Sequence, residues 1–192
     1  MTLTAGPDTK SSDSQQVLGA TAHFRFSGPS QLLMLSIRAA TINDVTLLRT
    51  LIRELAEYEK ELDQVLITEA ELARDGFGPE PKFHVLLAYW DREPVGYALF
   101  FDVYSTWRGR QMFLEDLFVR EAFRERGVGK GLMAAVARIA EREGCYALRW
   151  EVLAWNRAAV KWYESLGAEF LDDWRSAILK DEDLRRLAET AP

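Results

Sequence analysis

Apolar and polar residues alternate over residues 112–119, which predicts a strand with one buried face. Beyond Gly129 the spacing of leucine, methionine and valine changes to that of an amphipathic helix. Two apolar runs flank the turn at residues 91–94 and predict strands over residues 83–90 and 95–104. The centre of the chain is therefore predicted to hold three strands followed by a helix.

Further elements are predicted on both sides of this centre. Residues 35–38 predict a first strand, and the T-x-x-D sequence from Thr41 to Asp44 predicts the start of a helix that continues toward Tyr58. A second, short helix follows Thr68. Downstream, the pattern predicts a strand at residues 147–152, a helix after Asn156 and a strand at residues 174–179. The order βααβββαβαβ indicates an α/β protein of the α+β type, with no internal repeat.

The join between the central strand and the following helix is rich in glycine. Arg124, Gly127, Gly129 and Gly131 follow an R-x-x-G-x-G-x-G order. Glycine lets backbone N–H groups turn inward without a Cβ in the way, and a helix N-terminus adds unpaired N–H groups and a partial positive charge. The segment therefore predicts a pyrophosphate-binding loop, although a glycine-rich helix start without a ligand has the same sequence.

Two better-known phosphate-binding sequences do not match. A P-loop requires Ser or Thr after its Gly-Lys pair, and here Lys130 is followed by Gly131. The dinucleotide fingerprint requires its glycines directly after the strand and a third glycine near Met133, and neither condition is met. Only Glu151, at the end of the next predicted strand, lies about where that fingerprint places a ribose-binding acid.

A second motif follows downstream. Asn156, Ala159, Tyr163 and Gly167 are spaced by three, four and four residues, which on a helix places them along one face. Asn is also a preferred N-cap and Gly a frequent C-terminal stop, so an ordinary capped helix with a core tyrosine is the alternative interpretation.

Together these segments resemble the paired coenzyme-A motifs of the GNAT acetyltransferase superfamily. The sequences LEDLFV, FRERGVGKG, WNRAAVKWYESLGA, RELAEYEKELDQV and LITEAELARDGFG resemble most closely the diamine acetyltransferases, the spermidine/spermine and thialysine N-acetyltransferase group. The resemblance covers roughly residues 35–180. It implies a mixed, curved sheet with helices on both faces, acetyl-CoA as cosubstrate, a small-molecule amine as acceptor, and a homodimer.

Acetyl transfer from a thioester to an amine needs an uncharged nucleophile, a stabilised oxyanion and a protonated leaving thiol. A lysine-like amine has a pKa of roughly 10.4, so a base is required at neutral pH. The resemblance assigns the base to Glu115, acting directly or through water, and the proton donor to Tyr163. Asp116 is the weaker candidate base; in a regular strand it would point away from Glu115, as a structural hydrogen-bonding carboxylate.

The resemblance also implies which residues bind the two substrates. Tyr58, Glu59 and Glu115 would line the amine pocket, and Trp150 and Glu151 match pocket positions by alignment but not by identity. The backbone of Leu117, Phe118 and Val119 would pair with the pantetheine arm like an added strand. The remaining coenzyme-A contacts would come from Arg124, Glu125, Arg126, Gly127, Val128, Gly129, Lys130, Asn156 and Ala159.

Two departures from the family bear on the amine pocket. Ala154 stands where relatives usually carry an acid, and the loop at residues 171–173 is shorter than in the animal spermidine enzymes. The physiological amine is therefore left open among spermidine, thialysine, lysine analogues and other diamines. A catalytically silent acetyl-CoA sensor is the alternative function, and a Rossmann-like oxidoreductase is a third hypothesis.

Composition narrows the possibilities further. The 192 residues suit one domain, and the net charge of -6 argues against nucleic acid as a partner and is compatible with a cationic substrate. One cysteine excludes an internal disulfide and, with two scattered histidines, argues against a metal site.

Residues 1–33, rich in Ser, Thr, Gly and Gln, predict a disordered extension without signal-peptide character before a single acetyltransferase domain at residues 34–192. No run is apolar enough to span a membrane, so the expected location is cytoplasmic.

Overall fold

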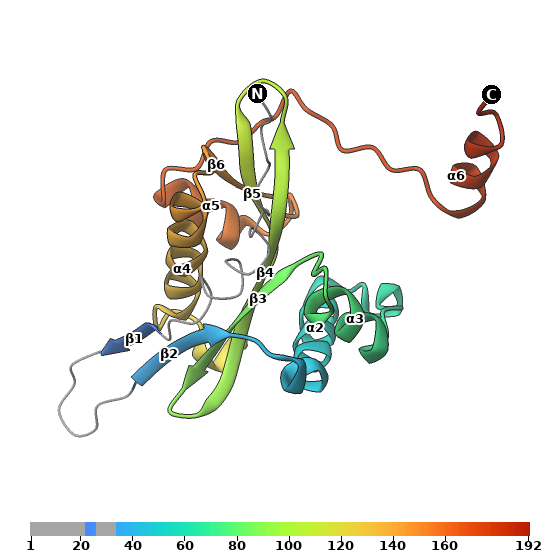
Figure 1. Ribbon diagram of the computed structural model, residues 1–192. Coiled ribbons are helices and arrows are strands. Elements are labelled where there is room, and N and C mark those ends of the chain that lie inside the picture. The colour runs from blue at the N-terminus through green and yellow to red at the C-terminus, as the bar shows by residue number, and fades with distance from the viewer. Residues whose placement is uncertain (1–21, 26–33) are drawn as a thin grey trace, which may run out of the picture. The chain divides into compact units, whose positions relative to one another are not determined.

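The computed structural model describes residues 22–25 and 34–192, and its chain divides into two compact units, Met1–Glu151 and Val152–Pro192. The first unit contains a six-stranded sheet in the order β1-β2-β3-β4-β5-β6 (Figure 1). Neighbouring strands are antiparallel except for β5 and β6, which are parallel. The strands are β1 Ala22–Arg25, β2 Met34–Ala39, β3 His84–Trp90, β4 Glu93–Ser105, β5 Gly109–Val119 and β6 Ala147–Trp150.

Most of the predicted strands are confirmed, and one strand is new. The hairpin between β3 and β4 turns at Asp91 and Arg92, which both have positive φ, as a turn matched to the twist of a hairpin requires. Strand β1 pairs with β2 and lies within the segment that was expected to be an extension without regular structure. The rest of that expectation, residues 1–21 and 26–33, lies outside the described residues.

Helices cover both faces of the sheet (Figure 1). On one face lie α2 Val45–Glu59 and α3 Glu69–Phe77; on the other lies α4 Val128–Arg142. The core under α2 and α3 is built from every second residue of the strands, including Leu87 of β3, Tyr97 of β4 and Phe118 of β5. Short 3₁₀ turns, η1 Ile42–Asp44, η2 Leu62–Gln64 and η3 Glu121–Phe123, connect these elements.

The predicted helix starts are confirmed by their capping contacts. The backbone N–H of Thr41 donates to Asp44 Oδ2 at 2.8 Å, and the N–H of Glu71 donates to the Thr68 hydroxyl at 3.2 Å. Helix α2 ends where Lys60 adopts a left-handed conformation. Its acidic end is not only solvated surface, because Glu54 forms a bidentate ion pair with Arg120 at 2.7 and 2.8 Å and so ties α2 to the end of β5.

Strand β5 is interrupted by a bulge. Asp116 pairs with Leu99 of β4, but the next pair is Leu114 with Phe100, so Glu115 is an extra residue without a partner position on β4. The expectation that Glu115 and Asp116 point to opposite faces applied to a regular strand, and this strand is not regular. Because of the bulge, the neighbouring carboxylates of Glu115 and Asp116 can lie in the same region of the sheet.

The parallel pairing of β5 with β6 ends before β5 does. It covers Gln111 to Leu114 on β5 and Ala147 to Trp150 on β6. Strand β5 then continues to Val119. In the part of the chain that the structure describes, no strand accompanies this last stretch of β5 on its β6 side.

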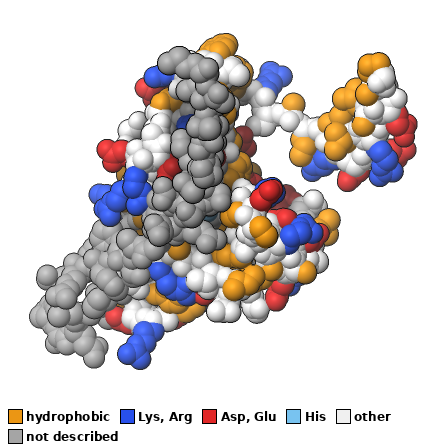
Figure 2. Space-filling model, in the orientation of Figure 1, with side chains coloured by type: hydrophobic (Ala, Val, Ile, Leu, Met, Phe, Trp, Pro, Cys, Tyr) orange, Lys and Arg blue, Asp and Glu red, His pale blue; other side chains and the backbone are white. Residues whose placement is uncertain are grey.

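The second unit contains α5 Arg157–Ser165 and α6 Asp181–Ala188. The strand predicted at residues 174–179 is absent, so the predicted element order is wrong at its last member. An isolated apolar stretch forms a strand only beside a partner that binds its backbone groups, and the sequence pattern cannot supply that partner. Helix α6 is amphipathic, and hydrophobic side chains gather on one side of it (Figure 2). Its Leu184 and Leu187 are exposed.

Every helix among the described residues is too short or too polar to cross a bilayer.

Candidate active site

Acidic side chains gather around the bulge of β5. The hydroxyl of Tyr97 donates to Asp116 Oδ2 at 2.8 Å. Burial raises the pKa of Asp116 to about 6, and the negative charges of Glu115 and Glu59 raise it further, against the opposing effect of the Tyr97 hydrogen bond. These four residues come from α2, β4 and β5, and we call them the carboxylate cluster.

The two glutamates of the carboxylate cluster are also perturbed. Glu115 is exposed as a residue, but partial desolvation of its carboxyl group raises its pKa, with a smaller contribution from the charge of Glu151. Burial likewise raises the pKa of Glu59, with a smaller contribution from Glu61. A carboxylate with a raised pKa is a stronger base, and several of them together attract a cation. The cluster therefore combines the two properties that an amine-binding, proton-accepting site needs.

Tyr97 is a member of the cluster that the sequence analysis did not identify. Its side chain is fully buried, and burial together with the Asp116 charge raises its pKa well above the usual range of a phenol. Tyr97 therefore remains a hydrogen-bond donor to Asp116 at neutral pH. The sequence signal was the one hydroxyl-bearing residue at a core position of the apolar segment VGYALFF.

Tyr58 and Arg124, predicted for different substrates, contact each other. The Arg124 guanidinium lies 4.4 Å from the centroid of the Tyr58 ring, and its Nε donates to the Val119 carbonyl at 3.0 Å. Arg126 similarly stacks on the Trp90 ring, 5.7 Å from its centroid. Both arginines thus hold the loop before α4 against aromatic rings.

The N-terminus of α4 offers backbone donors to an anion. Gly127 is the N-cap with a φ of 81°, a conformation that favours glycine. The first N–H to bond back to it is that of Gly131, at 2.9 Å, so the N–H groups of Val128, Gly129 and Lys130 have no acceptor within the helix. This arrangement fits a pyrophosphate.

Gly131 serves packing rather than phosphate binding. A Cβ at this position would lie 3.0 Å from a Leu35 methyl carbon and 3.1 Å from one of Ile37. The last glycine of the motif therefore allows α4 to approach β2 closely, and the phosphate loop is limited to the residues before it.

The backbone of Leu117, Phe118 and Val119 lies on the stretch of β5 that extends beyond β6. An extended ligand arm could pair there like an added strand. The Val119 carbonyl, however, already accepts the hydrogen bond from Arg124.

The second unit holds the other predicted residues. Asn156 Oδ1 accepts a hydrogen bond from the Ala159 N–H at 3.3 Å, so Asn156 is the N-cap of α5. Tyr163 is only 7% exposed, and burial raises its pKa to about 12. Its hydroxyl is therefore protonated at neutral pH and can donate a proton.

Comparison with known proteins decides the family. Residues 46–168 match the acetyltransferase (GNAT) family model. The chain is a GNAT acetyltransferase. The thialysine N-epsilon-acetyltransferase of Sus scrofa is 42% identical over 163 residues, covering 79% of this chain and 96% of the relative. The L-ornithine N5-acetyltransferase of Arabidopsis thaliana is 28% identical and covers 79% of this chain and 86% of the relative.

Solved structures agree on the fold. An integron cassette protein from the mobile metagenome of V. cholerae superimposes with a TM-score of 0.69 at 25% identity, covering 81% of this chain and 98% of that one. An aminoglycoside N-acetyltransferase in complex with CoA gives a TM-score of 0.61 at 23% identity, with 81% and 99% covered.

The predicted fold, enzyme class and cosubstrate are therefore confirmed: this acetyltransferase is an acetyl-CoA-dependent N-acetyltransferase. The Rossmann-like hypothesis is wrong, because the described sheet is antiparallel at every pairing except β5 with β6.

Proposed function

We propose that this acetyltransferase transfers the acetyl group of acetyl-CoA directly to a primary amine of a small diamine, polyamine or lysine-like acceptor, within a ternary complex. Its relatives support this range, since their names specify thialysine and L-ornithine. The observation that carries the proposal is the carboxylate cluster, in which Glu59, Glu115 and Asp116 all have raised pKa values.

Glu115 is proposed as the proton acceptor, directly or through water. The amine nitrogen attacks the thioester carbonyl carbon and must lose a proton as the new C–N bond forms. Nearby carboxylates stabilise the ammonium form, so the amine needs a base more than it would in water. Glu115 is exposed at the bulge, whereas Asp116 is engaged by the Tyr97 hydroxyl. The exposed carboxylate is therefore the one that an incoming amine can reach.

Tyr163 is proposed as the proton donor to the departing thiolate when the C–S bond breaks. Its hydroxyl keeps its proton until a strong base develops beside it, because burial raises its pKa to about 12. No covalent enzyme intermediate is required.

The amine and coenzyme A would be bound by separate sets of residues. We propose that Tyr58 and Glu59 hold a second cationic group of a diamine, with Trp150 and Glu151 at the edge of the pocket; the charge of Glu151 already acts on Glu115. The coenzyme-A arm would contact the backbone of Leu117 to Val119, and its pyrophosphate the N–H groups of residues 128–130. Loop residues Arg124, Glu125, Arg126 and Gly127, with Asn156 and Ala159, complete the proposed cosubstrate contacts. We also propose that the protein forms a homodimer and is cytoplasmic.

An acetylation assay with coenzyme A release as readout tests the function. Wild type should acetylate at least one of spermidine, putrescine, thialysine, lysine and a simple monoamine. Glu115→Gln should lower kcat for every acceptor and flatten the acidic limb of the pH profile. Glu141→Gln, a matched change on the exposed side of α4, should leave both unchanged. No turnover of any amine by wild type would favour the silent acetyl-CoA sensor.

A further inference from the structure

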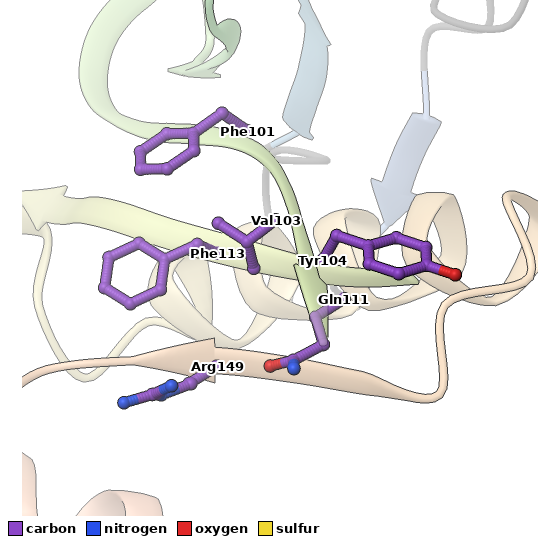
Figure 3. Close-up of a pocket in the computed structure, with 6 residues that line it drawn as sticks. All are labelled: Phe101, Val103, Tyr104, Gln111, Phe113 and Arg149. Carbon is purple, nitrogen blue, oxygen red and sulfur yellow. The ribbon is translucent and has the colours of Figure 1, made fainter. Parts of the chain in front are cut away.

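A pocket of about 290 Å³ opens on the sheet of the first unit (Figure 3). Its lining comes from three neighbouring strands of the first unit: Phe101, Val103 and Tyr104 of β4, Gln111 and Phe113 of β5, and Arg149 of β6. None of these residues belongs to the site described above. The pocket is therefore a separate part of the same sheet surface.

The polar groups of the pocket have no protein partners among the described residues. The residue Gln111 is only 8% exposed, and its carboxamide forms no hydrogen bond with the part of the chain that the structure describes. The same holds for the Arg149 guanidinium, which extends from β6 alongside the Phe113 ring (Figure 3). No buried side-chain nitrogen or oxygen of the described residues lacks a hydrogen-bond partner, so the Gln111 amide reaches the opening of the pocket, and Arg149 is exposed. Both groups are therefore accessible to a polar ligand.

The remaining walls are apolar. The rings of Phe101 and Phe113 lie 5.4 Å apart between centroids, and Val103 lies beside them. Such walls can pack against the methylene chain of a ligand, while a guanidinium binds a carboxylate through two parallel hydrogen bonds. The chemistry favours a ligand with a short aliphatic chain and a carboxylate at one end.

The strand register relates this pocket to Glu115. Arg149 pairs with Phe113, which is two residues before Glu115 on β5. At about 3.3 Å per residue, the backbone positions of Arg149 and Glu115 are separated by about 7 Å along the strand direction. The extended side chain of a lysine-like amino acid covers such a span.

We propose that Arg149 and Gln111 form a carboxylate-binding subsite that selects amino-acid acceptors of the lysine or ornithine type over diamines and polyamines. The inference rests on the proposed function. Arg149 binds the α-carboxylate, Gln111 hydrogen-bonds the same carboxylate or the α-ammonium group, and the terminal amine reaches Glu115. A polyamine has no carboxylate for Arg149 and places a cation beside it instead.

Lysine and cadaverine test the subsite because they differ only by the carboxylate. For Arg149→Gln, kcat/KM for lysine should fall by about 10- to 100-fold, the effect of losing a charge-assisted hydrogen-bonded pair, while cadaverine stays within about twofold. Gln111→Met should also lower kcat/KM for lysine selectively. Arg149→Lys, which keeps the charge without the planar fork, should give an intermediate loss. Arg138→Gln removes the same charge from the exposed side of α4 and should change neither acceptor.

The outcomes separate the two proposals. Equal losses for lysine and cadaverine in Arg149→Gln would overturn the subsite while leaving the proposed function intact. Absence of acetylation of any amine by wild type would overturn the proposed function and the subsite with it. Stabilisation of each variant by acetyl-CoA in a thermal-shift measurement checks that it is folded, and Gln111→Met and Arg149→Lys decide the question should Arg149→Gln not fold.

Discussion

The ionisation of Asp116 should make the stability of this acetyltransferase fall as the pH rises through 6. The pKa of Asp116 is 3.8 for an ordinary aspartate and is raised to about 6 in the folded protein. Between these values the folded state binds more protons than the unfolded state, so the free energy of unfolding decreases with increasing pH. At about 1.36 kcal/mol for each pKa unit, the full decrease amounts to about 3 kcal/mol, of which about 2.4 kcal/mol falls between pH 4 and pH 8.

Asp116→Asn removes this dependence with little change of shape. The amide oxygen can still accept the hydrogen bond from Tyr97, and the variant has no charge to bury. We expect its free energy of unfolding to exceed that of wild type by up to about 3 kcal/mol at pH 8, and the two to converge near pH 4. Tyr97→Phe should act in the opposite direction, because loss of the hydroxyl removes the hydrogen bond that lowers the pKa of Asp116.

Urea unfolding followed by tryptophan fluorescence at intervals from pH 4.5 to pH 8 measures these differences. Asp172→Asn, an exposed aspartate in the second unit, is the matched control and should reproduce the wild-type pH dependence. If Asp116→Asn and wild type lose stability in parallel over this range, Asp116 is not the group whose ionisation causes the pH dependence.

Four further substitutions test separate parts of the site. Tyr163→Phe should lower kcat strongly with acetyl-CoA affinity nearly unchanged, because the hydroxyl acts in the transition state; unaltered turnover removes it from the mechanism. Gly129→Val should abolish stabilisation by acetyl-CoA in a thermal-shift assay, and native affinity would place the phosphate site elsewhere. Gly131→Ala should instead cost about 1 to 3 kcal/mol of stability through contact with β2 while acetyl-CoA still binds; an unchanged melting temperature would contradict this packing. Glu59→Gln should raise the KM for cadaverine by about 10- to 100-fold with kcat little altered, and a loss confined to kcat would exclude a holding role.

Local features could be predicted from the sequence because they depend on residues close together in the chain. The caps at Thr68 and Asn156 are set by side chains that bond to backbone three residues away. The alternation in β3 to β5 and the glycine-rich start of α4 are local in the same way. These motifs, with the family resemblance, were sufficient to predict the GNAT fold and the acetyl-CoA chemistry.

The strand geometry at Glu115 and the groups around it are decided only by the tertiary structure. A bulge is a mismatch between two strands, so neither β4 nor β5 alone reveals that Glu115 is the extra residue. The raised pKa of Asp116 results from Tyr97, Glu59 and burial, which the fold brings together from distant parts of the chain.

The same distinction applies to the pocket and to the incorrectly predicted strand. Gln111 and Arg149 appear in the sequence as an ordinary strand glutamine and an ordinary arginine, and only the pairing of β5 with β6 brings them to one pocket. Residues 174–179 have an apolar pattern suited to a strand, but pairing decides whether a strand forms. Sequence periodicity determines which faces of an element are apolar, whereas contacts between elements determine which charges meet and which backbone groups are paired.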